Sequence, residues 1–190
     1  MKPRDENKIH DIYRATLHLV KDKGLAGITM GQIAKKAGLA TGTVYIYFTN
    51  KDELINSLFN ACRKASVAVY FQDYDPKAPF HTGFRTIWMN VMRYRMEKFE
   101  EAIFLEQCLH SPFITASNRE TANQLIQPLF SLMERGKKEK KIRNLDNFLL
   151  LASIIGSISE VNKHAHYTNR KLSGSELAAV FDLCWDGLRT

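Results

Sequence analysis

Cysteine is scarce in this chain of 190 residues, and the three that occur are far apart. Cys62, Cys108 and Cys184 form no Cys-x-x-Cys pair, which argues against a disulfide framework and against a thiolate zinc site. We interpret them as small buried side chains in a reducing cytosol. No two histidines have the three- or four-residue spacing that brings metal ligands together on a helix. We therefore expect no metal ion and no cofactor.

Long hydrophobic runs are also missing. The longest, residues 148–158, has about eleven residues, which is short of the roughly twenty that cross a bilayer. No apolar stretch follows the charged N-terminus, so a secretory signal is not indicated. We expect a cytoplasmic protein without a membrane partner.

Signatures of catalysis are absent as well. There is no Gly-x-Ser-x-Gly elbow, and the stretch from Gly38 to Thr43 lacks the lysine and the spacer of a phosphate-binding loop. Adjacent carboxylates such as Glu100 and Glu101 diverge on a helix. Nothing in the sequence predicts an enzyme.

Positive charge is plentiful and unevenly placed. Residues 1–51 contain nine Lys and Arg against four Asp and Glu, whereas residues 52–190 contain eighteen against sixteen. A local excess of this kind is typical of a phosphate-binding surface, although a charge run alone is more often a solvated face. The motif that follows favours phosphate binding.

Residues 29–54 predict two short helices joined by a tight turn and followed by the start of a third. Thr29 can cap the first helix while Gln32 reaches back to it. Gly38 can then adopt the left-handed conformation that ends a helix without a steric penalty. This pattern indicates a helix-turn-helix.

The second of these helices begins near Thr41, with Val44 and Phe48 on one buried face. Its N-terminal end would enter the major groove of DNA, and Gly42 would allow close approach of the backbone. Four hydroxyls are expected to project outward toward phosphates and base edges: Thr41, Thr43, Tyr45 and Tyr47.

The run GLATGTVYIYFTNK, residues 38–51, resembles the signature of the TetR family of bacterial transcriptional repressors. The resemblance covers about residues 9–54, and the rest of the chain agrees in length and helical character. It implies that Lys51 contacts phosphate and that the second helix is the recognition helix. Met30 offers an apolar contact to a thymine methyl group. The predicted DNA-binding residues are Met30, Gln32, Thr41, Gly42, Thr43, Tyr45, Tyr47 and Lys51.

Two positions depart from the family pattern. Ala40 stands where a capping serine is common, so the cap shifts to Thr41 or weakens by about 0.5–2 kcal/mol. Gly31 stands where some members carry a base-reading side chain, which predicts poorer readout from the first of the two helices.

The whole chain reads as helical, and short β-branched runs lie inside helical patterns. A helix over residues 9–20 precedes the motif, and Asn50 with Glu53 caps a helix that runs to about residue 70. Further helices are predicted at 84–96, 97–110, 116–136 with a kink or break at Pro128, 145–167 and 176–188. We expect an all-α fold with a three-helix DNA-binding domain at residues 1–50 and a helical effector-binding and dimerisation domain at 51–190.

The last two predicted helices are too apolar for lone surface helices. Small residues in the first of them would let a partner helix approach closely, although a helix buried within one monomer is the alternative. The resemblance places the family's dimer-forming bundle here, and reading two half-sites requires a two-fold dimer. The predicted dimer residues are Ala152, Ser153, Gly156, Ser157, Phe181 and Trp185.

The middle of the chain is rich in methionine and aromatic residues. Such a stripe is core more often than pocket, but Met and aromatics also form adaptable apolar surfaces, and bundles often hold ligands between helices. The resemblance implies a small-molecule inducer in this region. The predicted ligand-binding residues are Cys62, Trp88, Met89, Met92, Phe104 and Cys108.

These patterns together predict a homodimeric transcriptional regulator, a repressor released from a palindromic operator in double-stranded DNA by a small apolar or amphipathic effector. Two alternatives stay open. One is a non-specific architectural DNA-binding protein, and the other is a helical ligand-binding or enzymatic protein with a vestigial helix-turn-helix.

Overall fold

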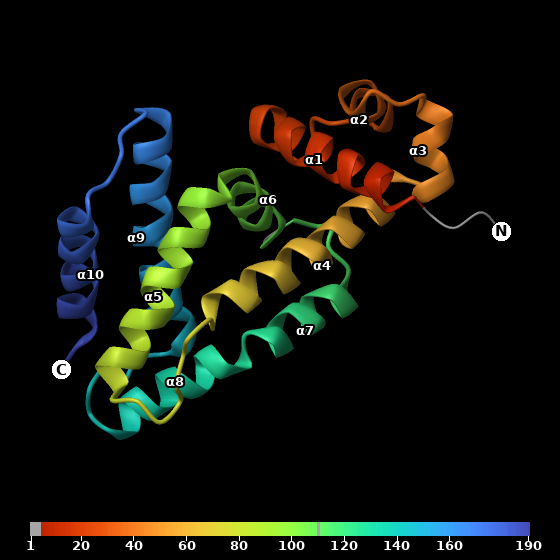
Figure 1. The fold of residues 1–190 in the computed structure, drawn as a ribbon. Helices are drawn as coiled ribbons and strands as arrows, with labels where there is room; N and C mark the ends of the chain where they lie inside the picture. Colours follow the sequence, from red (N-terminus) through yellow and green to blue (C-terminus); the bar gives the residue numbers. More distant parts are fainter. Residues whose placement is uncertain (1–4, 110) are drawn as a thin grey trace. The chain divides into compact units, whose positions relative to one another are not determined.

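The computed structural model describes residues 5–109 and 111–190, which form helices joined by short connections (Figure 1). The first five are α1 (Glu6–Lys23), α2 (Met30–Ala37), α3 (Thr41–Tyr47), α4 (Lys51–Tyr70) and α5 (Phe80–Glu97). The next five are α6 (Phe99–Leu109), α7 (Ala116–Leu125), α8 (Gln127–Lys138), α9 (Asn147–Tyr167) and α10 (Gly174–Leu188). Extended pairing in the described ranges is limited to one isolated bridge. The all-α prediction is confirmed.

The chain divides into two compact units. The first contains the described residues up to Lys64 together with Glu100–Ala122, and the second contains Ala65–Phe99 and Asn123–Thr190. The predicted functional limits, 1–50 and 51–190, stay a prediction. Among the described helices, none is both long and apolar enough to cross a membrane.

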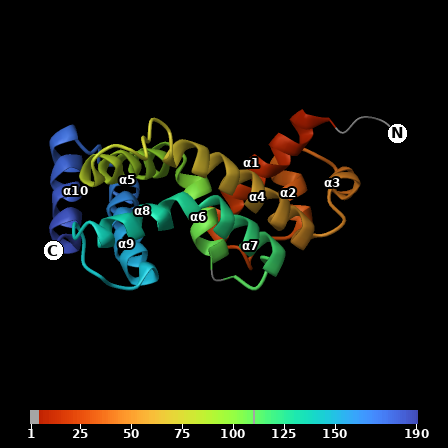
Figure 2. The ribbon, with the colours of Figure 1, turned by 90° about the horizontal axis from the view of Figure 1, so that it is seen from below.

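The helix-turn-helix forms through the local interactions that its sequence predicts. Thr29 accepts from the Gln32 backbone N–H at 3.3 Å, and the Gln32 side chain accepts from the Thr29 N–H at 3.1 Å. Gly38 adopts a left-handed conformation with φ 71° and closes α2. Figure 2 shows α1, α2 and α3 lying together, and α2 packs against both of the others.

Helix α3 is held by its apolar side. Val44 and Phe48 are 0% and 4% exposed, as predicted, and the Tyr13 ring of α1 lies 5.9 Å from the Phe48 ring. Ala40 is the N-cap and makes no side-chain hydrogen bond. Of the two predicted alternatives, the structure therefore agrees with a weakened cap and not with a cap shifted to Thr41, because α3 begins without a side-chain cap.

Helix boundaries in the rest of the chain follow proline and capping residues. The predicted helix over 116–136 is two helices, with Pro128 in the first turn of α8, where its missing N–H removes no helical bond. Helix α9 begins after Asp146 and α10 after Ser173, and both side chains accept a backbone N–H. The predicted end of α6 at His110 lies outside the described residues.

The second unit is built around α5, which packs against α8, α9 and α10. Its core is aromatic: Trp88 and Phe181 are each 1% exposed, and their rings lie 5.4 Å apart. Gly136 of α8 lies directly against the Phe80 ring, so a larger residue would clash there. This dense core fixes which faces of α9 and α10 remain outside.

Candidate DNA interface

One face of α3 is left open to solvent. Thr41, Gly42, Tyr45 and Ile46 are exposed, and they form two neighbouring stripes with a spacing of four residues. Tyr45 is 50% exposed and Ile46 is 73% exposed. Thr43 is half-buried at the edge of this face. We call the four exposed residues the α3 face.

Two of the residues predicted to contact DNA are buried. Tyr47 is 7% exposed because it lies three residues after Val44, on the buried side of α3. Met30 is also 7% exposed and belongs to the apolar side of α2. Neither side chain projects outward, so the apolar contact expected from Met30 is not available in this structure. Ile46, which was not among the predicted DNA contacts, is an apolar residue of α3 that does project.

Lys51 begins α4 and connects three segments of the first unit. Its Nζ donates to the Ala26 carbonyl at 3.2 Å and lies 4.9 Å from the centre of the Phe113 ring. Burial lowers the pKa of Lys51, and the neighbouring Asp52 carboxylate partly opposes that shift. The predicted phosphate contact of Lys51 stays a prediction, and the structure adds a role in holding the α1–α2 loop.

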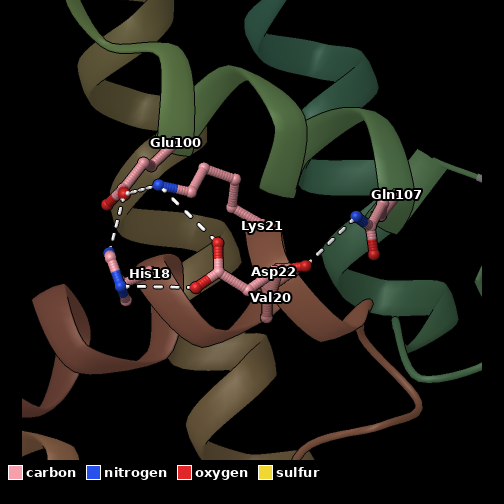
Figure 3. Close-up of polar contacts among 6 residues, drawn as sticks. All are labelled: His18, Val20, Lys21, Asp22, Glu100 and Gln107. Carbon is pink, nitrogen blue, oxygen red and sulfur yellow. Dashed lines mark hydrogen bonds and ion pairs between the residues drawn. The ribbon is translucent and has the colours of Figure 1, made fainter. Parts of the chain in front are cut away.

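Helix α6 braces α1 at two points (Figure 3). At one of them, Glu100 Oε1 lies 2.8 Å from Lys21 Nζ and 3.0 Å from His18 Nδ1. At the other, the Gln107 side chain accepts from the Leu25 N–H at 2.8 Å and lies 3.4 Å from the Val20 carbonyl, to which its Nε2 donates. Since α1 packs against α2, this brace supports the helix-turn-helix.

His18 lies between two carboxylates in the brace (Figure 3). Its Nε2 is 3.4 Å from Asp22 Oδ2, while its Nδ1 faces Glu100. Both ring nitrogens of His18 thus face a carboxylate oxygen. Burial raises the pKa of Glu100, but hydrogen bonds from Lys21 and His18 outweigh it, and the pKa lies below its usual value of 4.5. Among the described residues, no cluster of His, Cys, Asp or Glu is suited to a metal ion.

Comparison with known proteins identifies this arrangement. Residues 12–58 match the family model of bacterial regulatory proteins, tetR family. Residues 79–189, more than half of the chain, match the tetracyclin repressor-like C-terminal domain. The chain belongs to the TetR family. The predicted resemblance is confirmed, and it extends to the C-terminal region that the sequence motif did not cover.

Individual relatives in the TetR family match only part of this chain, at modest sequence identity. An uncharacterized HTH-type transcriptional regulator of Haemophilus influenzae is 32% identical over 97 residues, which are 51% of this chain and 52% of that protein. The chain thus spans about half the length of the curated relative that it matches. That relative is named as a transcriptional regulator, which agrees with the prediction that this chain is not an enzyme.

Solved TetR-family structures share the fold over nearly the whole chain. A TetR family regulator from Marinobacter aquaeolei has a TM-score of 0.87 at 23% identity, covering 99% of this chain and 98% of that one. FadR of Bacillus subtilis, solved in complex with stearoyl-CoA, has a TM-score of 0.65 at 21% identity, covering 93% and 95%. These likenesses concern the fold.

The predicted dimer residues fall on different faces. Ala152, Ser153, Gly156 and Ser157 are all exposed on α9. Phe181 is wrong as a surface residue, because it is 1% exposed and packs 5.9 Å from the Phe84 ring inside the second unit. Trp185 is half-buried and lies 4.8 Å from the His81 ring. The outer side of α10, which was not among the predicted dimer residues, carries Ala179, Leu183 and Gly187.

The predicted ligand residues are divided between the two units. Trp88 and Met92, each 1% exposed, belong to the aromatic core of the second unit, with half-buried Met89 packed against it. Cys62, Phe104 and Cys108 belong to the first unit and are buried. Burial raises the pKa of each of these two thiols to about 12, so both stay protonated at neutral pH.

The substitution Glu100→Gln removes the charge at the centre of the brace. Because folding lowers the pKa of Glu100, its stabilising contribution is complete above the ordinary pKa of 4.5 and is lost as the pH falls through the folded pKa. At pH 7 we expect the variant to lose about 1 kcal/mol of unfolding free energy, since a half-exposed ion pair is screened by water. The difference from the unsubstituted protein should shrink below about pH 4.

Urea unfolding between pH 7 and pH 3 measures this difference. Glu160→Gln is the matched control, because Glu160 is exposed and pairs only with Lys163 on its own helix among the contacts described. An equal loss in both variants, or a loss that persists at pH 3, would contradict the role of Glu100.

Proposed function

We propose that this TetR-family chain is a homodimeric, sequence-specific DNA-binding transcriptional regulator. More specifically, we propose a repressor that an apolar or amphipathic effector releases from a palindromic operator. The observation that carries the proposal is the α3 face, which is the solvent-exposed side of a helix whose opposite side is buried. Family membership supports the same function.

The chemistry of the first unit suits DNA. Thr41 and Tyr45 place hydroxyls on the α3 face, where they can reach phosphate oxygens and base edges. Lys35 and Lys36 are exposed at the end of α2, and cations near the recognition helix attract the phosphate backbone. Gln32 is half-buried and its oxygen serves the cap, so its amide nitrogen is what remains for a base contact.

Selection of binding sites from random duplex DNA, at near-physiological salt and without added ligand, tests this function. We expect an inverted repeat whose half-site centres lie about 34–36 Å apart or at a multiple of that distance. On the selected duplex, Lys51→Ala should weaken binding and lower the salt dependence of the affinity by about one phosphate contact. The loss should be similar on a scrambled duplex, since phosphate contacts carry no sequence information.

Lys64→Ala removes an equal charge from an exposed position of α4 and is the control for net charge. Circular dichroism of both variants checks folding, because Lys51 also holds Ala26. Strong salt-dependent binding without a recovered sequence would favour the architectural alternative. A Lys51 effect confined to one sequence would contradict the phosphate contact.

The outer surface of α9 and α10 supports a dimer. Small residues such as Ala152 and Gly156 on α9 allow a partner helix to approach closely, and Gly156 has open space at its Cβ position. Phe148 and Leu149 are 67% and 54% exposed, and Leu183 of α10 is 75% exposed. Apolar side chains gathered on two helices of one unit are typical of a protein interface.

The substitution Leu183→Arg places a charge on this surface without touching the monomer core. We expect the dimer dissociation constant to rise about tenfold or more, because the charge loses water at the interface. Sedimentation equilibrium measures the change. Leu109→Arg is the control, since Leu109 is 51% exposed in the first unit. Equal dissociation constants for both variants would rule out α10 as part of the interface.

The core of the second unit supports an apolar effector. Trp88 and Met92 lie in an aromatic and methionine-rich cluster, and such side chains adapt to apolar ligands. The complex of FadR with stearoyl-CoA shows that a protein of this fold holds a long acyl chain. We infer an effector with an apolar chain, of which a long-chain acyl thioester is the first candidate.

Stearoyl-CoA is the probe for this inference. We expect it to quench tryptophan fluorescence, raise the melting temperature and weaken binding to the selected duplex by about 5–150-fold. Coenzyme A without an acyl chain is the matched control and should have no effect. If melting temperature and DNA affinity stay unchanged with stearoyl-CoA, the acyl thioester is excluded as effector.

A further inference from the structure

Ile46 is an exposed apolar residue at a position where folding does not require one. It is 73% exposed, more than any other large hydrophobic side chain in the described part of the first unit. A β-branched residue is also a poor choice for a short exposed helix, because its side-chain torsion is restricted there. Local stability therefore does not explain an isoleucine at this position.

The surroundings of Ile46 give its side chain a definite direction. Side chains of a helix lean toward its N-terminus, so Ile46 extends over the position four residues earlier, which is Gly42. A Cβ atom at Gly42 would have nothing within 4 Å. The surface beside Ile46 is thus open, and a partner can approach the backbone of α3 closely at Gly42.

The neighbouring stripe has a different chemistry. Thr41 and Tyr45 present hydroxyls, whereas Ile46 presents only carbon. Hydroxyls can bind phosphates and polar base edges, and isoleucine can bind neither. In the major groove, the apolar group among the base edges is the C5 methyl of thymine.

We propose that Ile46 is a specificity-determining residue that contacts a thymine methyl group in each half-site. The contact replaces the one predicted for Met30, whose side chain is buried. It rests on the proposed function, because it needs α3 to lie in the major groove. It adds one defined base preference to that function.

Replacement of single thymines by deoxyuridine tests the contact, since uracil lacks the methyl group and keeps the same hydrogen-bonding edge. The probe is the duplex recovered by the selection described above. At one position of each half-site, we expect the exchange to weaken binding of the unsubstituted protein about threefold to tenfold. Ile46→Ala should lose a similar factor on the thymine duplex and nothing further on the uracil duplex.

Two variants sharpen the result. Ile46→Leu keeps an apolar side chain and should retain part of the preference for thymine over uracil. Leu109→Ala shortens another exposed apolar residue of the same unit and should leave the preference unchanged. Circular dichroism verifies that each variant folds.

Three outcomes would overturn the proposal. One is a half-site in which no thymine methyl affects binding. Another is an Ile46→Ala variant that prefers thymine over uracil as strongly as the unsubstituted protein does. The third is an equal loss for Ile46→Ala on all sequences. A selection that recovers no sequence instead contradicts the proposed function itself, and the inference falls with it.

Discussion

The left-handed turn at Gly38 is the constraint on which the DNA-binding unit depends. With φ at 71°, its N–H and that of Leu39 bond back to carbonyls near the end of α2, and the chain turns at once into α3. A residue with a Cβ atom is strained in this conformation. The turn decides that Val44 and Phe48 point inward, and so it also decides which residues form the α3 face. The contacts proposed for Thr41, Tyr45 and Ile46 follow from that choice of face.

The unit also needs support that comes from far along the chain. Helix α1 carries the helix-turn-helix, and α6 contacts it through Glu100 and Gln107, about 80 residues away. The two contacts differ in their physics. Glu100 contributes charge, which depends on pH and salt, whereas Gln107 bonds to backbone groups near the end of α1 through an uncharged amide that does not titrate. The position of α1 is therefore held by one contact that depends on pH, at Glu100, and by one that does not, at Gln107.

Sequence predicted best what local chemistry decides. The capping box at Thr29, the turn at Gly38 and the break before Pro128 each involve residues within a few positions, and all appear in the structure. The brace at Glu100 could not be predicted, because nothing in its neighbourhood indicates which distant helix it meets. Side-chain type also failed to predict whether a residue points into the core or toward solvent. Tyr47 was expected outside because of its hydroxyl and Phe181 as a residue of the dimer interface, and helix rotation places both inside.

The rotation of a helix about its axis decides which residues can be substituted on the α3 face and on the outer side of α10. On α10, Phe181 contributes to the core while Leu183, two positions later, faces outward. On α3, Val44 is buried while Ile46, again two positions later, is exposed. In both helices the inward residue is fixed by packing, since core substitutions cost several kcal/mol, and the outward residue is nearly unconstrained by folding. A new operator or a new partner surface can therefore be acquired by substitutions at positions such as Ile46 and Leu183 without loss of the fold.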